Sequence, residues 1–118
     1  RANIARVKKA VESAGENFSA KVIAADCTKC GLLSEKSFDI VFADPPYRMY
    51  DDPKTAPKLF ALFAQLSSPD TLFIIEAPAQ FDLAAATKPD GFAFSEIKRL
   101  GKKSAGKPSQ IIFKIEKQ

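Results

Sequence analysis

Three short apolar segments, each ending in an acidic residue, constrain the fold of this chain more than any other feature. They are Lys21–Asp26, Phe38–Asp44 and Thr71–Glu76. Continuous apolar runs of this length are typical of strands that are buried on both faces of a parallel sheet. The pattern therefore predicts an α/β fold with an acid at the carboxyl end of each of these strands.

Two helices are predicted around these strands. Apolar residues recur at helical spacing over residues 1–15, where Gly15 is placed to end the helix. A second apolar stripe runs from Thr55 or Ala56 to Leu66, and Pro57 favours a helix start there. A short helix over Asp82 to Ala86 has a weaker signal.

The end of the chain has a different periodicity. Apolar and polar residues alternate over Phe92–Ile97 and again over Ile111–Glu116, with the loop Gly101–Pro108 between them. Alternation with a period of two predicts an antiparallel hairpin. With 118 residues and no internal repeat, residues 1–118 are expected to form one domain.

Composition excludes several kinds of chemistry. The chain has no His, so His metal ligation and a Ser-His-Asp triad are excluded, and we predict no metal site. Cys27 and Cys30 form a C-x-x-C match, which is too small for a four-cysteine zinc site. A redox site is one interpretation of this pair, and two reduced cysteines in a loop is the favoured one. No apolar run approaches the roughly 20 residues that span a bilayer, so we expect no membrane partner.

The sequence Asp44-Pro45-Pro46-Tyr47 directly follows the second predicted strand. In an open α/β sheet, ligands bind beyond the carboxyl ends of the strands. Proline removes backbone donors and leaves carbonyls free to accept. A carboxylate and a proline carbonyl beside an aromatic ring can therefore receive a planar group that carries an amine. The alternative is a proline-stiffened turn in which Asp44 caps a neighbour and Tyr47 only packs.

At this point a family resemblance is evident. Phe38–Tyr47 resembles motif IV of the S-adenosylmethionine-dependent methyltransferases that methylate exocyclic amines of bases. The chain more narrowly resembles bacterial 16S ribosomal RNA guanine-N2 methyltransferases, in Arg1–Ile4, in Ala25-Asp26 and in Lys98–Gly101. The resemblance implies a partial Rossmann-like methyltransferase sheet, mostly parallel with a C-terminal antiparallel hairpin, and a cytoplasmic enzyme.

The resemblance also implies roles for individual residues. Asp44 and the carbonyl of Pro45 would accept hydrogen bonds from the target amine, and the ring of Tyr47 would stack on the flipped-out base. The cofactor's adenine would be bound by the Asp26 carboxylate and the Cys27 amide, with Asp44 also lining the cofactor site. Without this context, an acidic strand end exposed to solvent explains Asp26 equally well.

The chain departs from the family in lacking the glycine-rich turn that binds the cofactor. None of its five glycines forms a G-x-G turn after a strand, and the chain begins at Arg1 without a Met. We therefore interpret it as the C-terminal portion of a class I methyltransferase, with an incomplete S-adenosylmethionine site. In the family, two strands separate the one ending at Asp26 from the one ending at Asp44. We expect Val22–Ala25 to pair directly with Ile40–Ala43; the alternative is a homodimer through the exposed sheet edge.

The net charge of +4 permits an anionic partner. The partner implied is ribosomal RNA or a small-subunit assembly intermediate.

Arg48 to Lys54 is the predicted substrate loop, expected to be mobile because few of its residues could anchor it. Substrate contacts are predicted for Pro46, Tyr47, Arg48, Lys102, Lys103 and Lys107, with Lys98 and Arg99 in the same basic cluster. A solvated hairpin loop explains these lysines without RNA.

Two alternative functions stay open. One is DNA adenine-N6 or cytosine-N4 methylation, and the other is a non-catalytic binding module.

Overall fold

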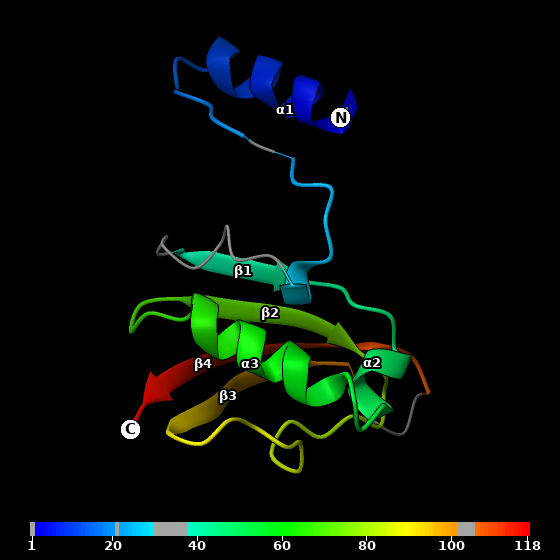
Figure 1. The fold of residues 1–118 in the computed structure, drawn as a ribbon. Helices are drawn as coiled ribbons and strands as arrows, with labels where there is room; N and C mark the ends of the chain where they lie inside the picture. Colours follow the sequence, from blue (N-terminus) through cyan, green and yellow to red (C-terminus); the bar gives the residue numbers. More distant parts are fainter. Residues whose placement is uncertain (1, 21, 30–37, 102–105) are drawn as a thin grey trace.

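The computed structural model describes residues 2–20, 22–29, 38–101 and 106–118. Its elements follow one another along the chain as α1 (Ala2–Ser13), η1 (Cys27–Lys29), β1 (Ile40–Ala43), α2 (Arg48–Asp51), α3 (Ala56–Leu66), β2 (Leu72–Ala77), β3 (Phe92–Leu100) and β4 (Ser109–Lys117). Figure 1 shows a twisted sheet with α3 lying across one of its faces. The helices predicted over 1–15 and up to Leu66, and the C-terminal hairpin, are confirmed.

The four strands of the described sheet lie in the order β1-β2-β4-β3. β1 pairs in parallel with β2, while β4 is antiparallel to both β2 and β3. The register aligns Ala43 with Ile75, so the carboxyl ends of β1 and β2 lie side by side. This arrangement confirms a mixed α/β fold with a C-terminal antiparallel hairpin.

The core lies between α3 and the sheet, because alternate residues of β2 and β4 point toward this helix. Phe63 of α3 is buried against Phe73 of β2 and Phe113 of β4, and Phe60 of the same helix is buried against Phe94 of β3. The Phe73 and Phe113 rings stack with their centroids 5.1 Å apart, and Phe63 meets both of them at a steeper angle. Burying four aromatic rings provides the main stabilisation of this face.

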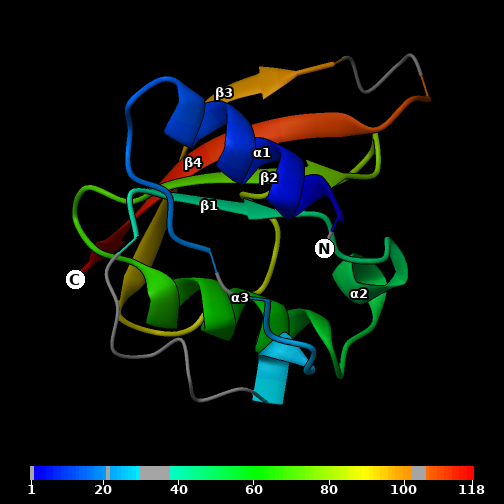
Figure 2. The same cartoon turned by 90° about the horizontal axis from the view of Figure 1, so that it is seen from above.

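The opposite face of the sheet is much more open. Ile40 and Phe42 of β1 are 61 % and 60 % exposed. α1 has no buried residues, and it lies beyond the β1 edge of the sheet, apart from α3 (Figures 1 and 2). Apolar side chains on this face of β1 are therefore left largely in contact with solvent.

The strand predicted over Lys21–Asp26 is wrong in its described part. Residues 22–26 are irregular and exposed, and none of the described strands pairs with them. A strand requires a neighbour for its backbone hydrogen bonds, and β1 finds its described partner in β2 alone. The predicted pairing of Val22–Ala25 with Ile40–Ala43 is wrong for the same reason. The homodimer alternative stays a prediction.

The helix predicted over Asp82 to Ala86 is also wrong, because this segment forms turns. Ala85 N–H donates to the Asp82 carbonyl, three residues earlier, rather than four. The Lys88 ammonium donates to the carbonyls of Leu83 and Ala84, at 2.6 and 3.1 Å, which a longer helix would use for its backbone. Pro89 disfavours helical backbone at Lys88 and so prevents the extension.

Across the part of the chain that the structure describes, no helix combines the length and the apolar character needed to cross a membrane.

Candidate functional site

The Asp44–Tyr47 segment begins directly after β1, at the carboxyl end of the parallel pair β1 and β2 (Figure 1). Since Ala43 aligns with Ile75, the next residue on each strand places Asp44 beside Glu76. Two acidic residues from different parts of the sequence thus meet at one edge of the sheet. This is the edge at which open α/β sheets bind their ligands.

The two proline carbonyls of the segment differ in their hydrogen bonds. The Pro46 carbonyl accepts from Met49 N–H at 2.9 Å, and the Tyr47 carbonyl accepts from Tyr50 N–H at 3.1 Å as α2 begins. The Pro45 carbonyl accepts none from the described residues. Pro45 therefore presents the main-chain acceptor that remains open beside Asp44.

The Asp44 side chain is exposed and, within the described ranges, accepts no hydrogen bond either. Asp44 and Pro45 thus offer two open acceptors on consecutive residues, a carboxylate and a carbonyl. A ligand group with two N–H donors on one nitrogen can satisfy both acceptors at once. This geometry does not use Asp44 as a helix cap, which was the alternative interpretation of the motif.

Tyr47 lies beside these acceptors with 39 % of its surface exposed. Desolvation of the hydroxyl raises the pKa of Tyr47 above its ordinary value, and the negative charges of Glu76 and Asp44 raise it further. The phenol therefore stays protonated at neutral pH.

Tyr50 anchors the segment after the motif. Its ring is buried beside Phe81, with centroids 4.7 Å apart, and its hydroxyl donates to the Glu76 main-chain carbonyl at 2.6 Å. Burial also raises the pKa of Tyr50. The expectation that few residues could anchor Arg48 to Lys54 is wrong, because α2 forms there around this buried ring.

Asp26 lies in a different environment from Asp44. Its carboxylate accepts hydrogen bonds from Thr28 N–H at 3.0 Å and from the Thr28 hydroxyl at 2.7 Å, where η1 begins. It lines a cavity of about 320 Å³ together with Arg48 and Met49, but Asp44 is not among the residues around that cavity. The described lining of this cavity therefore contains one of the two predicted cofactor carboxylates. Cys27 is exposed, and Cys30 lies outside the described residues.

One predicted RNA-binding residue has an internal role instead. A β-bulge between Glu96 and Lys98 moves Arg99 to the same face as Ile111. There its guanidinium donates to the carbonyls of Phe81, at 2.8 Å, and Ala79, at 2.6 Å. Assigning Arg99 to the basic cluster is therefore wrong, and strict strand alternation gave no sign of the bulge.

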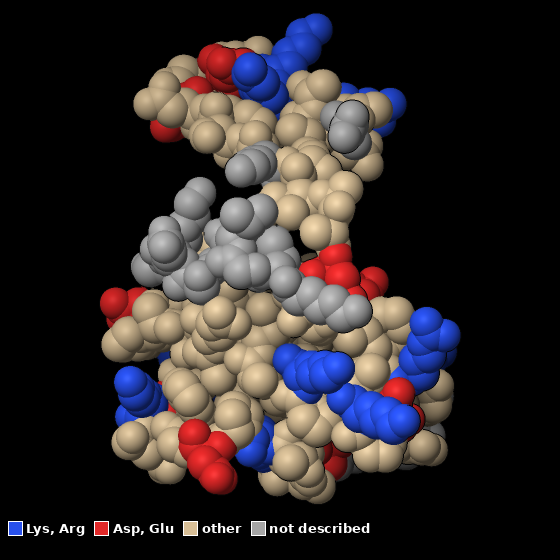
Figure 3. Space-filling model, viewed as in Figure 1, with Lys and Arg blue, Asp and Glu red and all other residues tan. Residues whose placement is uncertain are grey.

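The remaining basic residues are exposed where the structure describes them. Arg48 and Lys98 are exposed on α2 and β3, and Lys107 is exposed in the hairpin loop, which lies at the carboxyl end of β2. Lys102 and Lys103 lie outside the described residues. Figure 3 shows basic and acidic side chains interspersed on the face that carries α3. The described residues of that face form no continuous basic patch.

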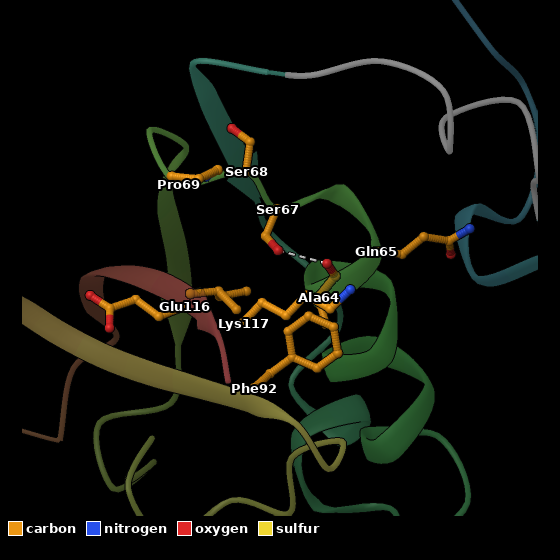
Figure 4. Close-up of a pocket in the computed structure, with 9 residues that line it drawn as sticks. Ala64, Gln65, Ser67, Ser68, Pro69, Phe92, Glu116 and Lys117 are labelled. Atoms are coloured by element: carbon orange, nitrogen blue, oxygen red, sulfur yellow. Dashed lines mark hydrogen bonds between the residues drawn. The ribbon is translucent and has the colours of Figure 1, made fainter.

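A larger cavity, of about 710 Å³, lies at the other end of the sheet (Figure 4). It is lined by the end of α3, the start of β3 and the end of β4. The Ser67 hydroxyl donates to the Ala64 carbonyl at 2.7 Å, and Ser68 bonds with Thr71. These polar side chains already have partners within the chain.

Comparison with known proteins identifies the fold. No protein-family profile matches the chain, and no curated protein sequence matches it. A crystal structure from Haemophilus influenzae, described as a "putative methylase", superposes with a TM-score of 0.54 at 19 % sequence identity. The match covers 93 % of this chain and 64 % of that one.

The chain has a partial Rossmann-like methyltransferase fold. It spans about two thirds of the length of the Haemophilus influenzae protein, and at 19 % identity the likeness concerns the fold. The partial Rossmann-like fold with a C-terminal antiparallel hairpin, implied by the sequence resemblance, is confirmed. The expectation of a mostly parallel sheet is wrong for the described strands, because β4 is antiparallel to both of its neighbours and only β1 and β2 pair in parallel. The narrower assignment to guanine-N2 methyltransferases, and the roles of Asp44, Pro45 and Tyr47, stay predictions.

Proposed function

We propose that this chain is the base-binding part of a methyltransferase that methylates the exocyclic amine of a nucleobase, with S-adenosylmethionine as the methyl donor. The specific acceptor we propose is guanine N2 of small-subunit ribosomal RNA. One observation carries the proposal: the open Asp44 carboxylate and the open Pro45 carbonyl lie together at the carboxyl end of β1. They do so in a sheet with a methyltransferase fold.

The two open acceptors suit the chemistry of a base amine. The lone pair of an exocyclic amine is delocalised into the ring, so this nitrogen is a poor nucleophile. When the Asp44 carboxylate and the Pro45 carbonyl each accept one N–H, they favour a pyramidal nitrogen and direct its lone pair away from these two acceptors. The chain thereby supplies orientation and electrostatic stabilisation, for which neither a strong base nor a metal is required.

Tyr47 would hold the base in place. A target base must leave its stack, which costs a few kcal/mol. Stacking on an aromatic side chain contributes about 1–3 kcal/mol per base. The exposed ring of Tyr47, next to the two acceptors, can therefore offset much of the cost of flipping.

The choice of guanine N2 in RNA rests on the sequence. It is supported by the narrower family resemblance of Arg1–Ile4, Ala25-Asp26 and Lys98–Gly101. The exposed Arg48, Lys98 and Lys107 would contribute contacts to phosphates.

The described residues can receive the amine of a base, but they provide only part of a binding site for S-adenosylmethionine. Asp26 accepts two hydrogen bonds from Thr28, and Asp44 is not among the described residues that line the cavity beside Asp26. The sequence contains no glycine-rich turn after a strand. We therefore expect weak or undetectable binding of S-adenosylmethionine by these 118 residues, measured by calorimetry. Low-micromolar affinity would contradict this expectation.

A methyl-acceptor assay tests the proposed function. The full-length protein that contains this chain would be incubated with tritiated S-adenosylmethionine and either assembled small ribosomal subunits or duplex DNA. We expect label in ribosomal RNA with wild type and with Asp39→Ala, a control at the opposite end of the same strand, and loss of label with Asp44→Ala. Label in DNA alone would favour the DNA methyltransferase alternative. Absence of label from both acceptors would refute the proposal.

A further inference from the structure

Arg99 is a charged residue of β3 whose side chain is directed into the molecule. Its guanidinium is half-buried and donates through Nη1 to the Phe81 carbonyl at 2.8 Å and through Nη2 to the Ala79 carbonyl at 2.6 Å. Its Nε atom is buried and has no acceptor among the described residues, and within the same ranges Arg99 forms no ion pair with a carboxylate. Removing a cation from water in this way is costly, so the two hydrogen bonds indicate what the residue does.

The two carbonyls belong to the turn that follows β2. Phe81 N–H donates to the Pro78 carbonyl at 3.0 Å, which closes a turn directly after Ala77, the last residue of β2. The turn therefore lies at the same edge of the sheet as the Asp44–Tyr47 segment, because the carboxyl ends of β1 and β2 are side by side. A guanidinium suits this turn because its planar fork of donors can hold two carbonyls at once.

The Phe81 side chain connects the turn to the residues after the motif. Its ring contacts the buried Tyr50 ring, with centroids 4.7 Å apart. The Tyr50 hydroxyl donates to the Glu76 carbonyl at 2.6 Å, and the Tyr50 N–H donates to the Tyr47 carbonyl at 3.1 Å. A continuous series of contacts thus runs from Arg99 through Phe81 and Tyr50 to the end of the motif.

The Asp44 carboxylate and the Pro45 carbonyl, called here the acceptor pair, depend on such support. Neither accepts a hydrogen bond from the described residues. Their positions are therefore determined by the elements on either side of the motif, which are β1 before it and α2 after it. A displacement of about 1 Å at a site of this kind can cost 10²-fold in rate.

We propose that Arg99 is a positioning residue: by holding the turn after β2, it keeps the Phe81 ring against Tyr50 and so keeps α2 and the acceptor pair in place. This inference rests on the proposed function for the identity of the ligand. It gives the C-terminal hairpin a role in methyl transfer that involves no contact with nucleic acid. A phosphate contact requires only a charge, whereas this role requires the guanidinium fork, so lysine can replace arginine in the first role and not in the second.

Amide hydrogen exchange tests the contacts without any assay of activity. In the full-length protein, Arg99→Lys should speed the exchange of the Tyr50 amide about tenfold, because the ring that packs on Tyr50 loses its support. Exchange in β4, which lies between β2 and β3, should change much less. Glu96→Gln, which removes an exposed charge on the same strand as Arg99, should leave both unchanged.

Two results of the exchange experiment would overturn the proposal. Unchanged exchange of the Tyr50 amide in Arg99→Lys would show that the turn does not support α2. Equal acceleration in α2 and β4 would show a loss of overall stability and no local positioning.

Steady-state methyl transfer tests the consequence for the reaction. Arg99→Lys should lower kcat for the RNA acceptor about tenfold with KM changed less, because the acceptor pair orients the amine in the chemical step. Phe81→Leu should reproduce this loss while the turn keeps its carbonyls for Arg99, and it provides the same test if Arg99→Lys does not fold. The double variant should be no worse than either single variant, because both act through one ring.

The kinetic results that would contradict the proposal are equally specific. Full kcat in Arg99→Lys would show that a charge alone suffices at this position. Additive losses of about a hundredfold in the double variant would show that Arg99 and Phe81 act independently.

The two experiments separate the two possible failures. A wild-type protein that methylates no acceptor refutes the proposed function and with it the positioning of an amine. A wild-type protein that is active, but whose Tyr50 exchange or kcat does not respond to Arg99→Lys, refutes the positioning role alone.

Discussion

The two ends of the sheet differ in a way that indicates where a ligand binds. The amino end of β2 borders a cavity of about 710 Å³, yet Ser67 and Ser68 there already form hydrogen bonds within the chain (Figure 4). The carboxyl ends of β1 and β2 carry the Asp44 carboxylate and the Pro45 carbonyl, which accept no hydrogen bond from the described residues.

The difference teaches that open hydrogen-bonding groups locate a site better than cavity size does. Polar groups with partners at the amino end stabilise the fold, because breaking a buried hydrogen bond costs free energy. Open acceptors at the carboxyl end add nothing to folding and remain available for a ligand. Substitutions at the carboxyl end should therefore reduce activity and leave the free energy of unfolding unchanged. Substitutions at the amino end should reduce the free energy of unfolding and leave activity unchanged.

The largest expected effect is that of Asp44→Ala in the full-length protein. Removing one oriented polar contact of this kind costs about 3–4 kcal/mol, or 10²–10³ in rate. The free energy of unfolding should stay unchanged, because Asp44 is exposed and makes no hydrogen bond with the described residues. Gln65→Ala, in the amino-end cavity, is the matched control and should keep full activity. Activity of Asp44→Ala within a factor of two of wild type would contradict the assignment.

Tyr47→Ala should have the next largest effect at the carboxyl end. Loss of the stacking ring should weaken use of the target base by about 1–3 kcal/mol. The measurement is kcat/KM for the RNA acceptor, compared with that of Phe92→Ala at the amino-end cavity. Equal kcat/KM for wild type and Tyr47→Ala would show that this ring does not receive the base.

Thr71→Val should produce the opposite result at the amino end. Thr71 is fully buried; its hydroxyl donates to the Phe38 carbonyl at 2.6 Å and accepts from Ser68 N–H at 3.1 Å. Valine fills the same space but leaves these partners unbonded, so the free energy of unfolding should fall by about 1–2 kcal/mol. Urea denaturation measures the loss, and methyl transfer by the folded protein should be unchanged. A stable but inactive variant would show that the amino end also takes part in the reaction.

The smallest expected effect concerns the lysines. Lys107 lies in the hairpin loop at the carboxyl end, whereas Lys117 lines the amino-end cavity. If Lys107 contacts a phosphate, Lys107→Gln should flatten the log–log salt dependence of RNA binding by roughly 0.7 to 0.9 without changing base preference. Lys117→Gln should leave the slope unchanged. Equal slopes for wild type and Lys107→Gln would show that this lysine is a solvated loop residue with no phosphate contact. Replacing Lys102 and Lys103 as well extends the test to the rest of the loop.

Local sequence signals predicted the elements whose partners lie within the described part of the chain. The apolar stripe that ends at Leu66 became α3, and the run ending at Glu76 became β2, because each packs against the other. The alternation in Phe92–Ile97 and Ile111–Glu116 predicted the hairpin, since those strands pair with each other.

The prediction failed where pairing depends on distant parts of the chain. Lys21–Asp26 has the same apolar pattern as the Phe38–Asp44 run, yet within the described ranges only the latter pairs with another strand. Apolar composition indicates that a segment can be buried, and it does not indicate that a partner exists. The turn at Asp82 shows the same dependence on context, because Lys88 competes for its carbonyls.

The candidate site was predictable in part. Asp44, Pro45 and Tyr47 were visible as a short motif after a strand. Whether each main-chain carbonyl of the motif already accepts a hydrogen bond depends on how α2 begins. Glu76 was visible only as the acid that ends an apolar run, since its place beside Asp44 requires the register of two strands.

The position of the transferred methyl group tests the proposed chemistry most directly. RNA labelled by the full-length protein would be digested to nucleosides and separated by chromatography with mass detection. Two acceptors around one amine predict a methyl group on an exocyclic nitrogen, and specifically N2-methylguanosine. A methyl group on a ring carbon, a ring nitrogen or a ribose hydroxyl would contradict the role of Asp44 and Pro45.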